Sequence, residues 1–137
     1  MSEIVIGYDG SDSAKTALEH GFEFAKSLDD TVLVVFGYAP GGYGGGEVPS
    51  QRDAVKEFGE KVTQEAADAA EKAKVKCEVL LVNKHPDAAL IDTANEHDAR
   101  MIVVGSHGEH PLKGAIIGST PLKLVQLSDK PVLVVRV

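Results

Sequence analysis

The segment Met101–Thr120, MIVVGSHGEHPLKGAIIGST, begins with four apolar residues and continues into a loop that contains four glycines. The run 101–104 predicts a buried strand, and the pattern over 119–127 is typical of a short helix. A loop between a strand and a helix is a usual place for an anion-binding turn in α/β proteins, and also for an ordinary turn. The remainder of the chain has to distinguish these two interpretations.

The whole chain repeats this alternation of strand and helix. Apolar runs predict five strands, at 4–6, 31–36, 75–82, 101–104 and 131–135, with a helical pattern between each pair. This alternation predicts an α/β fold with a parallel, doubly wound sheet and helices on both faces, in one domain spanning 1–137. We expect the strand order 3-2-1-4-5 and a flexible glycine-rich loop over about 39–50.

Two of the helical patterns have clear apolar stripes. The first stripe consists of Ala14, Ala17, Leu18, Phe22, Ala25 and Leu28. The second follows Ser50, which we expect to be the N-cap, and consists of Val55, Phe58, Val62, Ala66, Ala69 and Ala73. Pro86 suits the first turn of a third helix.

The charge balance excludes some classes of partner. Fourteen basic and twenty-one acidic residues give a net charge of -7, which argues against a surface for duplex nucleic acid. An anionic ligand would have to be held by backbone N–H groups and a few local cations. The single cysteine, Cys77, excludes an intramolecular disulfide and is expected to be buried and inert. No signal peptide or membrane-spanning run is visible, so we expect a cytoplasmic protein without membrane partners.

A doubly wound sheet binds ligands at the carboxyl ends of its strands, where the winding direction reverses. With the order 3-2-1-4-5 this crevice lies between the first and fourth strands. The loops after these two strands, Tyr8–Ser11 and Gly105–Thr120, are the two most polar glycine-bearing loops of the chain. The sequence therefore predicts a binding site formed by both.

The residue types of the second loop suit a phosphate. Gly105 and Gly108 permit close backbone approach, and Gly118-Ser119 opens a helix whose first N–H groups have no intrahelical partners. His107 and Lys113 are nearby donors, whereas Glu109 opposes an anion. Turn glycines followed by a serine N-cap would explain the same pattern, so at this level both readings stay open.

The spacing Gly105-x2-Gly108-x9-Gly118-Ser119 resembles the nucleotide-binding motif of the universal stress protein family, G-x2-G-x9-G-(S/T). IVIGYDGSDSAKTAL, residues 4–18, is similar to the opening of that family, and KPVLVVRV, residues 130–137, to its close. The resemblance covers the whole chain. It implies a Rossmann-like five-stranded domain and, in the subclass that keeps the glycine motif, ATP binding.

The resemblance also implies which residues form the site. Asp9 would lie beside the ribose and phosphates, in contact with a nucleotide-bound Mg²⁺. The nucleoside would be lined by Gly7, Tyr8 and Val104, and the adenine edge would meet the backbone of Gly37. The ribose and phosphates would lie along Gly105, His107, Gly108, Gly118, Ser119 and Thr120. Four residues depart from the family pattern: Gly37 in place of the usual Val, Lys84 in place of a frequent Gly, and Glu109 and Pro111 in the glycine loop.

Other interpretations of these residues remain. Asp9 could be only a helix cap, and His107-x-x-His110 could suggest a metal site, although two histidines without further ligands seldom form one. Gly41–Gly46 lacks the Lys-Ser/Thr of a Walker loop and is read as a linker or lid. No catalytic triad or paired carboxylates can be placed in one site.

The function predicted from the sequence is an ATP-binding, nucleotide-dependent regulator in the stress response, with at most slow ATP hydrolysis. An apolar edge strand at 132–135 and the family resemblance predict a homodimer through the C-terminal strand. One rival is a dimeric interaction module that binds no ATP. A second is an α/β protein that binds flavin or another nucleotide.

Overall fold

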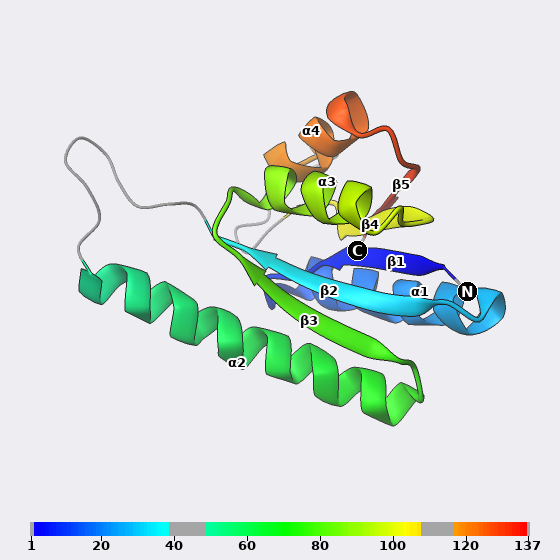
Figure 1. Ribbon diagram of the computed structural model, residues 1–137, viewed down its shortest axis with the longest axis horizontal. Coiled ribbons are helices and arrows are strands. Elements are labelled where there is room, and N and C mark those ends of the chain that lie inside the picture. The colour runs from blue at the N-terminus through cyan, green and yellow to red at the C-terminus, as the bar shows by residue number, and fades with distance from the viewer. Residues whose placement is uncertain (1, 39–48, 108–116, 137) are drawn as a thin grey trace.

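The computed structural model describes residues 2–38, 49–107 and 117–136, with the backbone alone for 49–53. Its centre is a sheet of five parallel strands in the order β3-β2-β1-β4-β5 (Figure 1). The predicted α/β fold and strand order are confirmed. The elements along the chain are β1 (Glu3–Gly7), α1 (Asp12–Leu28), β2 (Thr31–Gly37), α2 (Pro49–Ala73), β3 (Cys77–Val82), α3 (Pro86–Glu96), β4 (Met101–Gly105), α4 (Ser119–Leu127) and β5 (Val132–Val135).

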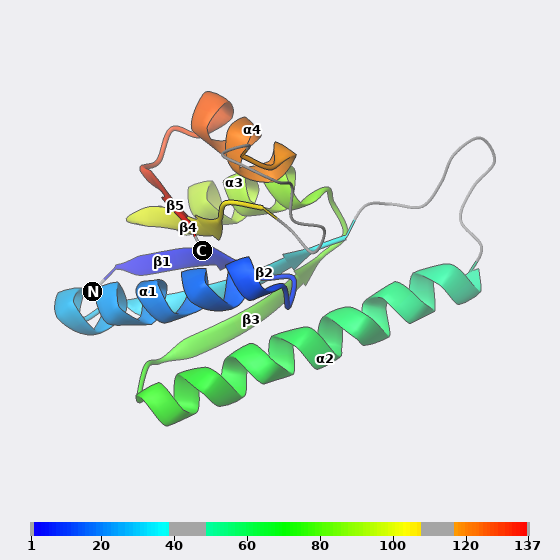
Figure 2. The same cartoon turned by 180° about the vertical axis from the view of Figure 1, so that it is seen from behind.

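The central strands bury both of their faces, which explains why they are apolar throughout. Ile4, Ile6, Val32 and Val34 face the layer formed by α1 and α2. Val5, Leu33, Val35 and Ile102 face the layer formed by α3 and α4. Residues of each strand thus alternate between the two layers with a period of two. In Figure 2, seen from behind, α1 lies in front of the sheet.

Helix α1 begins and ends at recognisable caps. Its N-cap is Ser11, whose Oγ accepts a hydrogen bond of 3.2 Å from the Ala14 N–H. Its C-cap is Asp29, in the left-handed conformation with φ of 55°. The predicted apolar stripe is buried from Ala14 to Ala25, but Leu28 is 39% exposed. The inclusion of Leu28 was wrong, because the chain reverses at Asp29 and no described element covers the last helical position.

Helix α2 differs more from the prediction. It begins at Pro49, so Ser50 lies inside the helix and is not its N-cap. Val62 and Ala66 are buried as expected, and Ala69 and Ala73 pack against the core. Val55 and Phe58 are 42% and 45% exposed, which contradicts their assignment to the buried stripe. The first turns of α2 project beyond the strands (Figure 1), and Phe58 meets the Phe36 ring of β2 edge to face, with 6.0 Å between the ring centroids, while it stays partly exposed.

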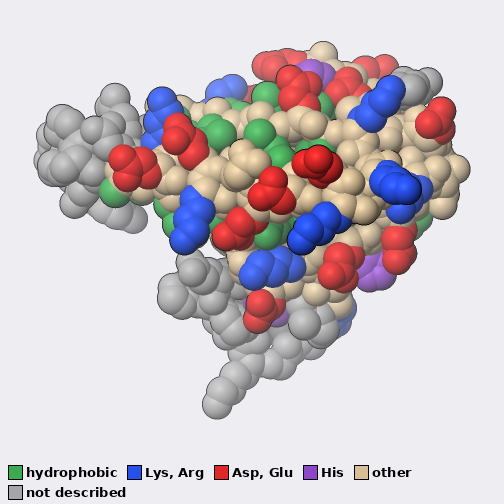
Figure 3. Space-filling model, turned by 90° about the horizontal axis from the view of Figure 1, so that it is seen from below, with side chains coloured by type: hydrophobic (Ala, Val, Ile, Leu, Met, Phe, Trp, Pro, Cys, Tyr) green, Lys and Arg blue, Asp and Glu red, His purple; other side chains and the backbone are tan. Residues whose placement is uncertain are grey.

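The surface over α2 carries charges of both signs. Acidic and basic side chains are interspersed on the face that Figure 3 shows, apart from the grey atoms. No continuous basic surface lies on the described part of this face. Cys77, at the start of β3, is half-buried rather than buried, and burial followed by the charge of Glu78 raises the pKa of its thiol to about 11. The prediction of a buried thiol was therefore too strong.

An ion pair joins the amino ends of the strands. The Asp30 side chain is fully buried and accepts hydrogen bonds from Arg100 Nε at 2.6 Å and from the Ser2 N–H at 3.0 Å. These contacts hold the pKa of the Asp30 carboxyl below its ordinary value, and the hydrogen bond from Arg100 is the largest cause. The loops before β2 and before β4 are thereby tied together, at the edge of the sheet opposite to the polar loops.

Candidate functional site

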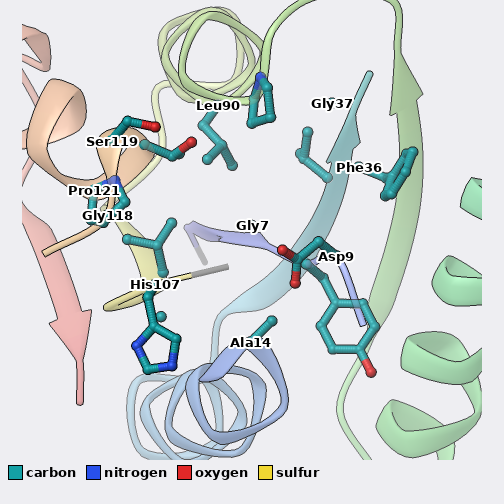
Figure 4. Close-up of a pocket in the computed structure, with 16 residues that line it drawn as sticks. Gly7, Asp9, Ala14, Phe36, Gly37, Leu90, His107, Gly118, Ser119 and Pro121 are labelled. Carbon is teal, nitrogen blue, oxygen red and sulfur yellow. The ribbon is translucent and has the colours of Figure 1, made fainter. Parts of the chain in front are cut away.

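A pocket of about 200 Å³ lies at the carboxyl ends of β1, β2 and β4 (Figure 4). It is the crevice at which the winding direction of the sheet reverses, since β1 is followed by β2 on one side and paired with β4 on the other. The lining combines backbone from three strand ends with the first turn of α4. It consists of Gly7, Tyr8, Asp9, Ala14, Val35, Phe36, Gly37, Pro86, Leu90, Val104, Gly105, His107, Gly118, Ser119, Thr120 and Pro121.

The structure brings most of the predicted site residues together around this pocket. Its lining includes Gly7, Tyr8, Asp9, Gly37, Val104, Gly105, His107, Gly118, Ser119 and Thr120. Gly108 lies outside the described residues. The same is true of Glu109, His110, Pro111 and Lys113, and of the glycine-rich segment 39–48.

In the loop after β1, one residue caps the helix and another lines the pocket, which the sequence could not show. Ser11 is the N-cap of α1, so Asp9 is not. Asp9 Oδ1 accepts a hydrogen bond of 2.9 Å from the Ser11 N–H and so shapes the turn that precedes the helix. Gly10 has a φ of 82°, which a residue with a side chain rarely adopts. In Figure 4 the Asp9 carboxylate points toward the pocket.

The loop after β4 is held by backbone hydrogen bonds at both of its described ends. The Ser106 N–H donates to the Val135 carbonyl at 2.9 Å, and the Gly118 N–H donates to the Ser106 carbonyl at 2.7 Å. A Cβ atom on Gly105 would lie 2.1 Å from Ser13 Oγ and 2.7 Å from the Ser13 carbonyl carbon. Gly105 is therefore required by the approach of α1 to the end of β4.

Among the described residues, the backbone N–H groups of Ser119 and Thr120 in the first turn of α4 have no hydrogen-bond acceptor. Its N-cap is Gly118, which has no side chain, and no side-chain cap hydrogen bond is present within the described residues. The N–H groups of Ser119 and Thr120 precede the first intrahelical donor, Leu122, which bonds to the Gly118 carbonyl at 3.2 Å. Helix α1, by contrast, satisfies a first-turn donor with Ser11. The positive end of α4 is therefore open toward the pocket, and it suits an anion.

The opposite end of the pocket is formed by β2 and α3. The β1–β2 ladder ends where the Tyr8 N–H donates to the Val35 carbonyl at 3.1 Å, so the backbone of Gly37 lies beyond its last bond. A Cβ atom on Gly37 would lie 2.7 Å from the Cα atom of Pro86. Glycine at this position, where the family resemblance leads one to expect Val, allows the first turn of α3 to pack directly against the end of β2.

Sequence reasoning missed the apolar wall of the pocket. The residues not predicted are Ala14, Val35, Phe36, Pro86, Leu90 and Pro121. Leu90 lies on α3, and its Cδ1 atom would lie 2.9 Å from a Cβ atom on Gly7. A periodic apolar pattern identifies a buried face, but it does not show which buried residues border a cavity.

The described side chains that line the pocket give it a slightly negative charge. Its described lining contains the Asp9 carboxylate and no lysine or arginine. Burial raises the pKa of the Tyr8 phenol, and the nearby carboxylates of Glu65 and Asp9 add to this effect. Among the described residues no group of three or more His, Cys, Asp or Glu side chains could hold a metal ion. No helix among them is long and apolar enough to cross a membrane.

The sheet order and the location of the pocket define an α/β protein with a ligand cavity at the switch point of a parallel sheet. Residues 1–136 match the universal stress protein family, and the chain belongs to that family.

Individual relatives agree with this assignment. Universal stress protein YxiE of Bacillus subtilis (strain 168) is 29% identical over 151 residues, covering 99% of this chain and 99% of the relative. A solved universal stress protein from Archaeoglobus fulgidus is 26% identical with a TM-score of 0.83, covering 98% of each chain. A structure of the universal stress protein from Archaeoglobus fulgidus in complex with dAMP has 26% identity and a TM-score of 0.74, covering 98% of this chain and 97% of that one.

Proposed function

We propose that this universal stress protein binds ATP in the pocket at the carboxyl ends of β1, β2 and β4. The observation that carries the proposal is the first turn of α4, which has no side-chain cap among the described residues and whose Ser119 and Thr120 line the pocket. Backbone donors at a helix N-terminus bind phosphate oxygens without a basic surface. The dAMP complex of a family relative supports an adenine nucleotide as the ligand.

The nucleoside would occupy the apolar end of the pocket. Leu90, Val104 and Pro86 offer apolar surface to a base. The backbone of Gly37, beyond the end of the β1–β2 ladder, can offer a donor and an acceptor to the edge of an adenine. Gly7 and Tyr8 would border the ribose. The triphosphate would then extend past Gly105 and His107 toward Gly118.

Asp9 is the residue that would bind a nucleotide-bound Mg²⁺. A triphosphate carries several negative charges, and the described lining offers a carboxylate but no lysine or arginine to neutralise them. Carboxylate and phosphate oxygens are the ligands that Mg²⁺ prefers, and it keeps several waters in such sites. Asp9 would hold the ion through its carboxylate, while Oδ1 also accepts from the Ser11 N–H.

The role that we propose is that of a nucleotide-dependent regulator in the stress response. The described lining contains no positioned pair of nucleophile and general base around Asp9, so we propose at most slow ATP hydrolysis. Efficient phosphoryl transfer needs charges that stabilise the transferred group, and backbone amides at one helix end supply only part of them.

We further propose that two copies pair through β5. This strand lies at the edge of the sheet, and Val132, Leu133 and Val134 are only half-buried. An apolar edge strand with unpaired backbone groups favours association with another strand. Pairing two copies through the same strand gives a closed, symmetric dimer.

Isothermal titration of the purified protein with ATP and Mg²⁺ tests the nucleotide proposal. Gly118→Val should weaken the binding, because a Cβ atom there would lie 3.2 Å from His107 Cα and 3.4 Å from the Ser106 carbonyl oxygen and would push the loop and the first turn of α4 apart. Ala54→Val, at an exposed position of α2, is the control for added bulk. Absence of heat at millimolar ATP would contradict the proposal and support an interaction module without nucleotide. Binding of flavin mononucleotide in place of ATP would support the flavin alternative.

A further inference from the structure

Ser106, which was not among the predicted site residues, contacts the imidazole of the residue that follows it. Its Oγ lies 3.1 Å from His107 Nδ1, and Ser106 is buried. The backbone of Ser106 is fixed on both sides, by the hydrogen bonds to Val135 and Gly118 described above. The hydroxyl that contacts the imidazole is therefore attached to a well-anchored part of the loop.

His107 lies beside the open end of α4. The Gly118 position approaches it closely, since a Cβ atom there would lie 3.2 Å from His107 Cα and 3.8 Å from His107 Cβ. His107 also lines the same pocket as Ser119 and Thr120. In Figure 4 its imidazole extends from the loop toward α1, on the side away from the Ser119 label. A phosphate held by the first turn of α4 would therefore lie beside His107.

The chemistry of a hydroxyl determines what it can do to this ring. A serine hydroxyl donates one hydrogen bond, and a neutral imidazole has one nitrogen that accepts and one that carries a proton. Among the described residues the Ser106 hydroxyl has no other acceptor, so it is free to donate to Nδ1. The ring proton is then on Nε2, where it can donate to a phosphate oxygen. The other tautomer would present a lone pair to the phosphate instead.

We propose that Ser106 is a positioning residue, which holds the His107 imidazole so that its Nε2–H donates a hydrogen bond to a phosphate of the bound nucleotide. This inference rests on the proposed nucleotide function. It assigns to Ser106 a contribution to phosphate recognition and none to recognition of the nucleoside.

The first experiment compares the affinities for ATP with Mg²⁺ and for adenosine, by isothermal titration, in three variants. Ser106→Ala should weaken ATP binding about five- to tenfold and change adenosine binding less than about twofold, because adenosine has no phosphate. Ser106→Thr keeps the hydroxyl and should stay within about twofold of the unmodified protein for both ligands. Ser128→Ala removes a serine hydroxyl at the far end of α4 and is the matched control. Equal losses for ATP and adenosine in Ser106→Ala, or no loss of ATP affinity, would overturn the proposal.

The second experiment needs no nucleotide. The ¹⁵N chemical shifts of the His107 ring should show the Nε2–H tautomer in the unmodified protein and in Ser106→Thr, and a mixture of tautomers in Ser106→Ala. A predominant Nδ1–H tautomer in the unmodified protein would overturn the positioning role. If the unmodified protein binds neither ATP nor adenosine, the proposed function fails, whereas the tautomer measurement still decides whether Ser106 orients the ring.

Discussion

The end of β2 and the start of α3 touch through Gly37 and Pro86, where a Cβ atom on residue 37 would lie 2.7 Å from the Pro86 Cα atom. A side chain at position 37 would clash with a backbone atom of Pro86. A rotamer change in a flexible side chain therefore cannot relieve this clash. It places the first turn of α3 at the apolar end of the pocket, which Leu90 of the same helix also lines.

Gly37→Val should therefore displace the first turn of α3. We expect the free energy of unfolding to fall by about 1–3 kcal/mol, as for other overpacked positions, and the affinity for adenine nucleotides to fall with it. Urea unfolding and ATP titration measure the two effects, and Ala54→Val again serves as the control. A variant with the stability of the unmodified protein would show that α3 adjusts to the larger residue without strain.

The loop after β1 allows helix capping and ligand binding to be separated. Ser11→Ala removes the N-cap of α1 and should lower the free energy of unfolding by about 1 kcal/mol. Asp9→Asn keeps an oxygen for the Ser11 N–H but removes the charge, so it should leave stability nearly unchanged and reduce the dependence of ATP binding on Mg²⁺. The two variants are compared by thermal unfolding and by ATP titration with and without Mg²⁺. If Mg²⁺ dependence persists in Asp9→Asn, the ion is held elsewhere.

The ion pair of Asp30 with Arg100 predicts how stability depends on pH. Because the folded-state pKa of Asp30 is lowered, its contribution is complete above the unfolded pKa of about 3.9 and is lost as the pH falls through the folded value. Asp30→Asn should lower the free energy of unfolding at pH 7 by about 1–2 kcal/mol; partial exposure of Arg100 limits the loss.

The measurement is urea unfolding at decreasing pH from pH 7, and the difference between Asp30→Asn and the unmodified protein should shrink as the pH falls through the lowered pKa of Asp30. Asp129→Asn, at an exposed position between α4 and β5, is the matched control and should follow the unmodified protein throughout. A constant difference between Asp30→Asn and the unmodified protein at every pH would contradict the assignment of the effect to the Asp30 charge.

The register of β5 identifies a substitution that blocks its open edge. The carbonyls of Pro131 and Val135 accept hydrogen bonds from β4, so the backbone groups of Val132 and Val134 face away from the sheet. Val134→Pro removes an outward N–H without removing a bond to β4, and should shift a dimer to monomer. Sedimentation velocity measures the change, with Val134→Thr as the control that keeps the N–H. A dimer unaffected by Val134→Pro would place the interface on another surface.

The elements that could be predicted from the sequence are those whose signal is local. Runs of apolar residues identified the five strands, although β3 begins at Cys77 rather than at Val75. Helical periodicity identified the buried residues of α1 up to Ala25. It could not show how deeply each residue of a stripe is buried, and Leu28, Val55 and Phe58, which belong to the predicted stripes, are 39%, 42% and 45% exposed.

The sequence also predicted only part of the candidate site. Glycines and polar residues after the first and fourth strands were visible as motifs, and strand order predicted that their loops would meet. The apolar wall of the pocket could not be predicted. The sequence pattern around Leu90 and Phe36 is the same whether these side chains pack against another residue or border a cavity. The contact of Ser106 with His107 was also missed, since adjacent residues in a loop need not point in the same direction.

By itself, the amino-acid sequence determined the order of strands and helices, the parallel class of the sheet and the glycine-bearing loops at its carboxyl edge. These follow from period, propensity and chain connectivity, which act over a few residues or over one crossover. The tertiary structure alone decided that Arg100 pairs with Asp30 across 70 residues, that Gly37 touches Pro86, and that the first turn of α4 is uncapped within the described chain. Each of these depends on the positions of groups from separate elements to within a few tenths of an ångström, and such distances are set only when all the elements pack together.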